Sequence, residues 1–143
     1  MTDARILVTG SRSWSDARLL ADTLLDVWHD ATELGHNSIV IVHGGADGAD
    51  TLAGLWAAGQ GLDVEVHEAD WSGPCGPECP PGHRKTNARG SDYCPLAGHR
   101  RNQQMIDAGA DLVVAFQRAG SRGTADAMNR ARKAGLPVRH ITG

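Results

Sequence analysis

The chain has 143 residues, of which 41% are hydrophobic, 22% charged and 4% aromatic, and its formal net charge is −3. This length and composition are typical of one soluble globular domain and exclude a disordered chain. The acidic balance and the scarcity of aromatic side chains argue against nucleic-acid binding, which uses basic patches and stacking rings. With no apolar run near the roughly 20 residues of a membrane span, and no signal-peptide pattern, we expect a cytoplasmic protein without membrane contact.

Strands and helices alternate along the first half of the chain. The apolar run at residues 5–8 predicts a buried strand, and apolar side chains recur at helical spacing from about Ser15 until Gly35. Residues 38–42 predict a second strand, which is followed by a second helix. Residues 63–67 alternate in polarity, as an exposed strand at the edge of a sheet does.

The second half begins with a segment that breaks this alternation. Residues 72–98 hold five of the six prolines, five glycines and all three cysteines, without periodicity. A helix from about His99 to Gly109 is predicted next. After it come a strand at 111–116, a helix opened by a glycine turn, and a last strand at 138–141. This order predicts a Rossmann-like, doubly wound, mainly parallel five-stranded α/β sheet with helices on both faces. Residues 1–143 then form one domain with an insertion.

Three predicted strand-to-helix turns are rich in glycine and meet at the carboxyl edge of the sheet, where such folds bind ligands. Glycine lets backbone N–H groups approach a phosphate, and the following helix offers the positive end of its dipole. The arginines of the turns add bidentate contacts, and the serine and threonine add hydroxyls. The candidate ligand-binding residues in these turns are Gly10, Ser11, Arg12, His43, Gly44, Gly45, Ala46, Asp47, Gly48, Gly120, Ser121, Arg122, Gly123 and Thr124.

Two alternatives limit this interpretation. Glycines at such turns can also serve only to reverse the chain. Asp47 and Asp50 are candidates for ribose contacts or acid–base roles, but an aspartate near a helix start is also a common cap. No turn matches G-x-G-x-x-G or a Walker A loop, so no dinucleotide cofactor is predicted.

Four motifs resemble the YspA-like branch of the SLOG superfamily. They are Ile-Leu-Val-Thr-Gly-Ser-Arg at 6–12, His-Gly-Gly-Ala-Asp-Gly-Ala-Asp at 43–50, Arg101-Asn102-x-x-Met105, and Gly-Ser-Arg-Gly-Thr-Ala-Asp at 120–126. The resemblance implies a Rossmann-like domain associated with nucleotide-derived ligands, and it adds Arg101 and Asn102 to the binding candidates. The superfamily includes LOG-type phosphoribohydrolases and DprA-type proteins that bind single-stranded DNA.

The comparison with LOG-type enzymes leaves catalysis open. Their P-G-G-x-G-T-x-x-E motif aligns its Gly-Thr with Gly123-Thr124 and places its catalytic glutamate at Ala127, which has no acid to offer. Asp126 is adjacent in sequence but about 100° away around a helix. Arg101 matches the arginine of the LOG R-K-x-x-M pattern and is the one catalytic candidate.

The insertion carries a pattern typical of a structural zinc site. Cys75, Cys79, His83 and Cys94 offer three thiolates and an imidazole, which would close a tetrahedral site without an open position. A metal would also give this irregular segment a reason to be ordered. His99 is a rival for the fourth position, and the alternative is a flexible loop with incidental cysteines.

Two further features of the sequence remain open. Arg84, Lys85, Arg89, Arg100 and Arg101 make the segment locally basic, which suits either a lid over a phosphate or a solvated face. Trp14 and Trp71 lie near the turns and either stack on a base or pack in the core, the second being the better expectation.

The sequence therefore predicts a protein that binds a phosphate-bearing, nucleotide-derived small molecule, as a sensor or a sequestering protein. An N-glycosidic phosphoribohydrolase and a single-strand nucleic-acid binder are the alternatives. The identity of the ligand, and whether the chain forms a homo-oligomer, stay open.

Overall fold

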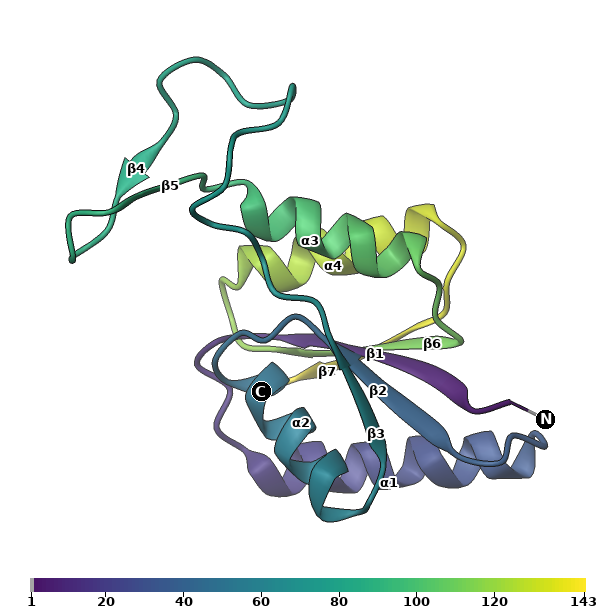
Figure 1. Ribbon diagram of the computed structural model, residues 1–143. Coiled ribbons are helices and arrows are strands. Elements are labelled where there is room, and N and C mark those ends of the chain that lie inside the picture. The colour runs from purple at the N-terminus through teal and green to yellow at the C-terminus, as the bar shows by residue number, and fades with distance from the viewer. Residues whose placement is uncertain (1) are drawn as a thin grey trace.

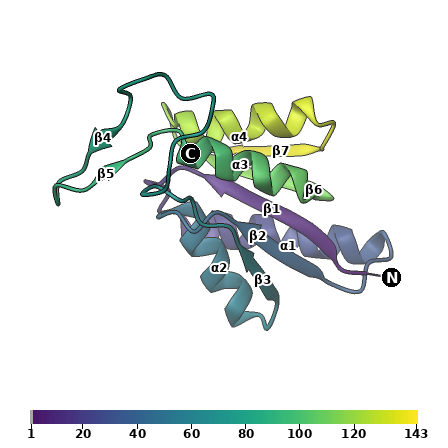
Figure 2. The same cartoon turned by 45° about the horizontal axis from the view of Figure 1, so that its top comes forward.

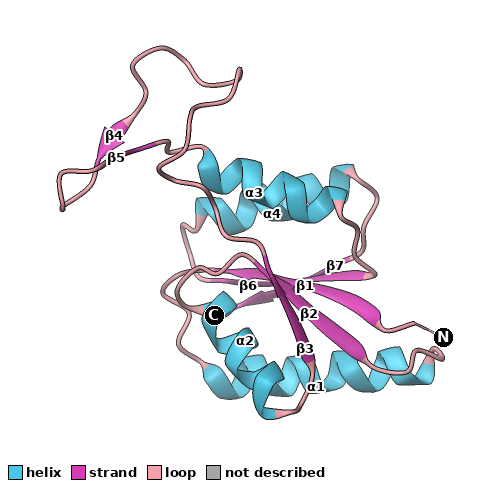
Figure 3. Cartoon of the chain, viewed as in Figure 1, coloured by secondary structure: helices cyan, strands magenta, loops and turns pink. Residues whose placement is uncertain are grey.

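The computed structural model describes residues 2–143 as seven strands and four helices (Figures 1 and 3). In chain order the elements are β1 Ala4–Gly10, α1 Ala17–Glu33, β2 Ile39–His43, α2 Ala49–Gly59, β3 Asp63–Val66, β4 Lys85–Thr86, β5 Asp92–Tyr93, α3 Ala97–Asp107, β6 Leu112–Gln117, α4 Arg122–Lys133 and β7 Val138–Thr142.

Five strands form one sheet in the order β3-β2-β1-β6-β7, and every neighbouring pair is parallel. The predicted Rossmann-like α/β fold is therefore confirmed. From β1 the chain adds β2 and β3 on one side of the sheet, and then β6 and β7 on the other side of β1. In such sheets the loops at this switch point flank a crevice. β3 lies at one edge, as its exposed alternation predicts.

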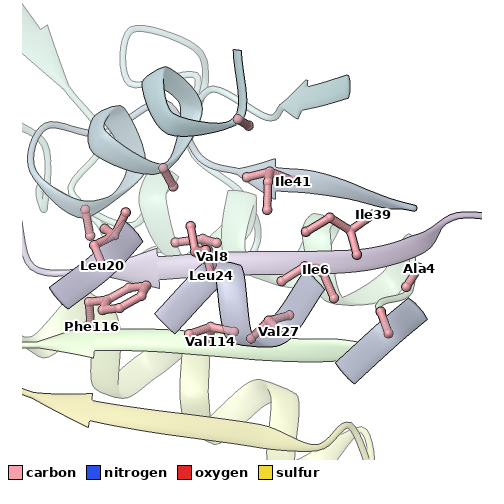
Figure 4. Packing of buried hydrophobic residues seen from close by; sticks show 14 of the residues in the cluster. Ala4, Ile6, Val8, Leu20, Leu24, Val27, Ile39, Ile41, Val114 and Phe116 are labelled. Atoms are coloured by element: carbon pink, nitrogen blue, oxygen red, sulfur yellow. The ribbon is translucent and has the colours of Figure 1, made fainter. Parts of the chain in front are cut away.

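The helices lie in two layers, with α1 and α2 on one face of the sheet and α3 and α4 on the other (Figures 1 and 2). Alternate residues of β1 pack against the two helix layers. Ile6 and Val8 pack with the buried face of α1, whereas Leu7 packs with Met105 and Ala131 on the opposite face. Figure 4 shows the first of these cores, in which side chains of α1 lie against β1, β2 and β6.

The local sequence explains where α1 begins. The carboxylate of Asp16 accepts a hydrogen bond from the Leu19 N–H at 3.0 Å and so caps the helix. Leu20, Leu24 and Val27 follow at helical spacing and are buried.

α2 packs closely on the sheet through small side chains. Its buried stripe consists of Ala49, Ala53 and Ala57, whereas Leu55 is 66% exposed. A Cβ at Gly10 would overlap the Cβ of Ala49, so the small residues on both sides permit this close approach.

The insertion projects from the α/β body beside the start of α3 (Figure 1). It contains a β4–β5 hairpin that the sequence analysis did not predict. The Asn87 carboxamide accepts from the backbone N–H groups of Arg89 and Ser91, and Gly90 turns the chain at a φ of 82°. The segment also ends slightly earlier than expected, because α3 begins at Ala97.

None of the helices within residues 2–143 combines the length and the apolar character that crossing a membrane would need.

Candidate functional site

A cavity of about 490 Å³ lies at the carboxyl ends of β1 and β6, next to the start of α3. It is the crevice expected at the switch point of this sheet. Its lining residues are Thr9, Gly10, Ser11, Arg12, Ser13, Ala46, Asp50, Trp71, Pro95, Gly98, His99, Arg101, Asn102, Met105, Ala119, Gly120, Ser121, Arg122, Gly123 and Thr124.

The first turn of α4 forms one wall of this cavity. Its backbone N–H groups have no intrahelical partner by geometry, and they give this wall a positive dipole end. A Cβ built at Gly123 or at Gly120 would meet no atom within 4 Å, so neither glycine is needed for packing. The hydroxyls of Ser121 and Thr124 lie 2.7 Å apart at the same turn. This wall offers open space, N–H donors and hydroxyls to an anion.

Three arginines supply positive charge around the cavity. Arg101 is the most enclosed of them, and burial lowers the pKa of its guanidinium. It donates to the Gly44 carbonyl and, at 3.0 Å, to the Asn102 side chain. Arg12 and Arg122 are exposed residues that line the cavity. One of the three charges is therefore partly buried and hydrogen-bonded, whereas the other two belong to exposed side chains.

Asp50 is the only carboxylate among the lining residues of this cavity within residues 2–143. It accepts the backbone N–H groups of Gly44 at 3.0 Å and Ala46 at 3.3 Å, which fixes the turn between β2 and α2. Burial raises its pKa to about 6, and these hydrogen bonds together with Arg101 only partly oppose the shift. Asp50 therefore organises the loop from the second position of α2, while Gly48 is the cap residue.

Several predicted site residues serve packing in the structure. A Cβ at Gly48 would overlap the Ser11 carbonyl, and one at Gly44 would overlap the Arg101 guanidinium. The Ser11 hydroxyl accepts the Arg118 N–H at 2.8 Å and so ties two of the turns together. These contacts support the alternative interpretation for the first two turns, in which glycine permits close approach of backbones.

His43 and Asp47 do not line the cavity. His43 is buried, accepts the Gly45 N–H at 2.9 Å and lies against Gly54 of α2. Burial, followed by the charge of Arg101, lowers its pKa. Asp47 is exposed on the loop.

A second compartment of about 280 Å³ adjoins the first. The two share Arg12, Ala46, Trp71 and Arg101. Gly44, Gly45, Glu68 and Ala69 complete the lining of the smaller one. The sequence analysis did not identify Glu68 and Ala69, although they follow β3 and therefore lie at the same carboxyl edge.

Ala127, where the LOG-type glutamate would lie, is on the buried face of α4, is 1% exposed and does not line the cavity. Asp126 is engaged elsewhere. It accepts the Asn102 amide at 3.1 Å and the Arg130 guanidinium at 2.9 Å, and it lies 3.9 Å from His99. Neither residue supplies a free carboxylate to the cavity.

The insertion brings its four predicted metal ligands together. The ligand atoms of Cys75, Cys79, His83 and Cys94 all lie within 4.8 Å of one another. The closest pairs are Cys75 Sγ to His83 Nε2 at 3.1 Å, Cys94 Sγ to His83 Nε2 at 3.3 Å, and Cys79 Sγ to Cys94 Sγ at 3.6 Å. Bonds of about 2.0–2.3 Å to a tetrahedral metal place ligand atoms about 3.5–3.8 Å apart. The residues can therefore hold a metal ion, and His83 rather than His99 completes the set.

Two arginines surround the thiolates. Arg84 donates to Cys75 Sγ at 3.5 Å, and Arg100 donates to the Sγ atoms of Cys79 and Cys94, each at 3.4 Å. Both are also paired with carboxylates, Arg84 with Asp92 and Arg100 with Glu78. Two of the five basic residues of this segment, Arg84 and Arg100, therefore contact the cluster. The sequence analysis noted these arginines but did not assign them to the thiolates.

The two tryptophans near the glycine turns, Trp14 and Trp71, have different environments. Trp14 is 3% exposed and packs on Phe116 with ring centroids 5.4 Å apart, which confirms the expected core position. Trp71 is half-buried and lines both compartments.

The fold and this cavity define a Rossmann-like α/β protein with a polar, arginine-rich crevice at the carboxyl edge of its sheet. The model of the YspA, cpYpsA-related SLOG family matches residues 4–73. The chain is also 40% identical over 139 residues to the Gene 61 protein of Mycobacterium phage D29, a match that covers 94% of this chain and 93% of the phage protein. The chain belongs to the YspA, cpYpsA-related SLOG family.

Solved structures share the fold. DNA processing protein A (DprA) from Streptococcus pneumoniae superposes with a TM-score of 0.68 at 20% identity. The match covers 99% of this chain and 51% of DprA, so this chain spans about half the length of that protein. The protein TM1055 superposes with a TM-score of 0.55 at 22% identity, over 96% of this chain and 72% of its own. At these identities the likeness shows the fold alone.

Proposed function

We propose that the protein binds a phosphate-bearing, nucleotide-derived small molecule in the cavity at the carboxyl edge of the sheet, as a sensor or a sequestering protein. The observation that carries this proposal is the first turn of α4, which lines the cavity, where a Cβ at Gly123 would meet open space and the N–H groups have no intrahelical partner. Arg12, Arg101 and Arg122 line the same cavity and match the charge of a phosphate. Membership of a SLOG family adds weight to a nucleotide-derived ligand.

A substitution that the fold tolerates tests this proposal. Gly123→Ala adds a methyl group that meets no protein atom, and alanine is favoured over glycine in a helix by about 0.5–1 kcal/mol. We expect the variant to be at least as stable as the wild type but to bind nucleoside monophosphates more than tenfold more weakly. Gly59→Ala is the matched control, because its added methyl also meets no atom, at the end of α2.

The measurement is isothermal titration calorimetry with AMP, GMP and inorganic phosphate. Loss of affinity in Gly123→Ala but not in Gly59→Ala supports the proposal. If none of these probes binds the wild type, the proposal fails.

We also propose that the cluster of Cys75, Cys79, His83 and Cys94 holds a structural zinc. Three thiolates and a neutral imidazole around Zn²⁺ carry one net negative charge, which Arg84 and Arg100 are placed to offset. A closed ligand set has no position for substrate, so the ion would fix the insertion. Native mass spectrometry should find one zinc per chain, and none after denaturation with a chelator.

The alternative functions have less support. For N-glycosidic hydrolysis, Arg101 lines the cavity but the position of the LOG-type glutamate is the buried Ala127. Chromatographic detection of free base from AMP or GMP would establish this activity. For single-strand nucleic-acid binding, only Lys85 and Arg89 of the basic segment are exposed side chains outside the cluster and the cavity. Salt-dependent binding equivalent to several released counterions would be required.

A further inference from the structure

Trp71 lies between the ligand cavity and the metal cluster. Its ring contacts Tyr93 edge-on, with centroids 6.1 Å apart and planes at 80°. The Arg12 guanidinium lies over the ring, 5.6 Å from its centroid. A Cβ at Gly98 would come within 3.0 Å of the ring, so this glycine makes room for it. These neighbours hold the indole as a wall shared by both compartments.

The other tryptophans of the chain have packing roles. Trp14 is buried against Phe116. Trp28 and Trp56 contact each other edge-on, 6.2 Å apart, on the layer of α1 and α2. Of the four, all within the described residues, only Trp71 lines the two compartments. A half-buried indole in a polar cavity is suited to stacking on a planar group.

The backbone of Trp71 is hydrogen-bonded to a member of the Cys75–Cys79–His83–Cys94 cluster. The N–H of Cys94, a member of the cluster, donates to the Trp71 carbonyl at 2.8 Å. Tyr93, which contacts the indole ring, directly precedes Cys94. Between residues 67 and 93 no residue is buried, so apolar packing alone does not fix this segment. A metal bound by Cys94 and its partners would hold Tyr93 and Trp71 in place.

We infer that Trp71 is a base-stacking residue of the ligand site and that the Cys75–Cys79–His83–Cys94 cluster is the element that positions it. The ligands are therefore phosphates that carry a planar heteroaromatic base, rather than simple sugar phosphates. This inference rests on the proposed phosphate site at α4 and extends it with a second contact. The phosphate lies at the first turn of α4, and the base stacks on the indole beside the Arg12 guanidinium.

Stacking of a base on an aromatic side chain strengthens binding by roughly tenfold to a hundredfold. The test compares ribose 5-phosphate with AMP, GMP, CMP and UMP by isothermal titration calorimetry. We expect the nucleotides to bind the zinc-loaded wild type at least tenfold more tightly than ribose 5-phosphate. Trp71→Leu should abolish this preference and leave the affinity for ribose 5-phosphate within about twofold. Trp71→Phe should keep part of the preference, and Trp28→Phe, on the opposite layer, should keep all of it.

The same calorimetric comparison tests whether the preference for nucleotides over ribose 5-phosphate depends on the metal. Cys79→Ser, or chelation of the wild type verified by mass spectrometry, should reduce the preference for nucleotides without a comparable loss for ribose 5-phosphate. Circular dichroism should show that the variants keep their α/β content. Phosphate binding without a preference for base-bearing ligands, or a preference that survives in Trp71→Leu or in the metal-free protein, overturns this inference alone. Failure of every phosphate ligand to bind overturns the proposed function as well.

Discussion

The α/β body and the insertion are ordered by different means. In the body, Leu24, Val114 and Phe116 are fully buried, and they belong to one continuous core between α1 and the sheet (Figure 4). In the insertion, the first buried residue after β3 is Cys94, and the contacts around it are polar and thiol contacts. Apolar packing orders the first region, whereas the second is linked by polar and thiol contacts among side chains positioned to bind a metal. The cavity lined by Arg12, Trp71 and Arg101 lies where the two regions meet.

The difference predicts that metal removal acts on one region only. Structural zinc sites in small peptides contribute about 10–16 kcal/mol of apparent binding free energy, so chelation should release the insertion. We expect amide protons of residues 72–94 to exchange without protection while those of β1 and β6 stay protected. Hydrogen exchange read by mass spectrometry, with and without chelator, measures this. Loss of protection in β1 as well would mean that the two regions are one cooperative unit.

A substitution in the apolar core should destabilise the α/β body and leave metal binding by the insertion unchanged. Phe116→Ala removes a fully buried ring that packs on Trp14, and it should lower the free energy of unfolding by about 3–5 kcal/mol. The fraction that remains folded should still hold one metal per chain. Leu55→Ala, at a position 66% exposed, is the control and should change stability much less. Urea denaturation gives the stability, and native mass spectrometry gives the metal content.

Asp50 belongs to α2 and also lines the cavity. Its carboxyl group should make the stability of the protein depend on pH. Burial raises the folded-state pKa from 3.8 to about 6, so the folded protein holds this proton more tightly than the unfolded chain. The stabilisation that comes from this tighter proton binding is present in full below pH 4 and is lost as pH rises through 6. The free energy of unfolding falls by about 3 kcal/mol over this range. Asp50→Asn keeps an oxygen for the N–H groups of Gly44 and Ala46 and removes the titration.

The stability of Asp50→Asn relative to the wild type should therefore rise between pH 4 and 7 and then level off. Urea denaturation of both proteins across this range measures the difference, in which the titration of other groups cancels. A difference that does not vary with pH would contradict the assigned burial of the Asp50 carboxyl group.

The sequence predicted the sheet because its signals are local and repeated. Runs such as residues 39–42 are apolar throughout, and glycines such as Gly35 stop the helices, so element order and parallel pairing follow from pattern alone. The β4–β5 hairpin was missed because each strand has two residues, too few for alternation to register. The alanine-lined packing face of α2 is not evident from the sequence, because the close approach of Ala49 to Gly10 depends on the packed fold.

The position of the candidate site was predicted in outline for the same reason. The carboxyl ends of parallel strands share an edge, so the turns at Gly10 and Gly123 could be placed together from order alone. Their different roles could not, because packing against Ala49 and open space at Gly123 are visible only in three dimensions. Likewise the spacing of Cys75, Cys79 and Cys94 predicted a cluster, and the contact of Trp71 with Cys94 needed the fold.

The smallest expected effect concerns the arginine nearest the thiolates. Arg100 donates to the Sγ atoms of Cys79 and Cys94, and such outer contacts to metal ligands are typically worth 10- to 100-fold in metal affinity, about 1.4–2.8 kcal/mol. Arg100→Gln should weaken zinc binding by about that factor in competition with a chromophoric chelator. Arg89→Gln, an exposed basic residue of the same segment, is the control for net charge. An unchanged affinity in Arg100→Gln would assign this arginine to its ion pair with Glu78 instead, and the insertion would then depend on the metal ligands without help from the surrounding charge.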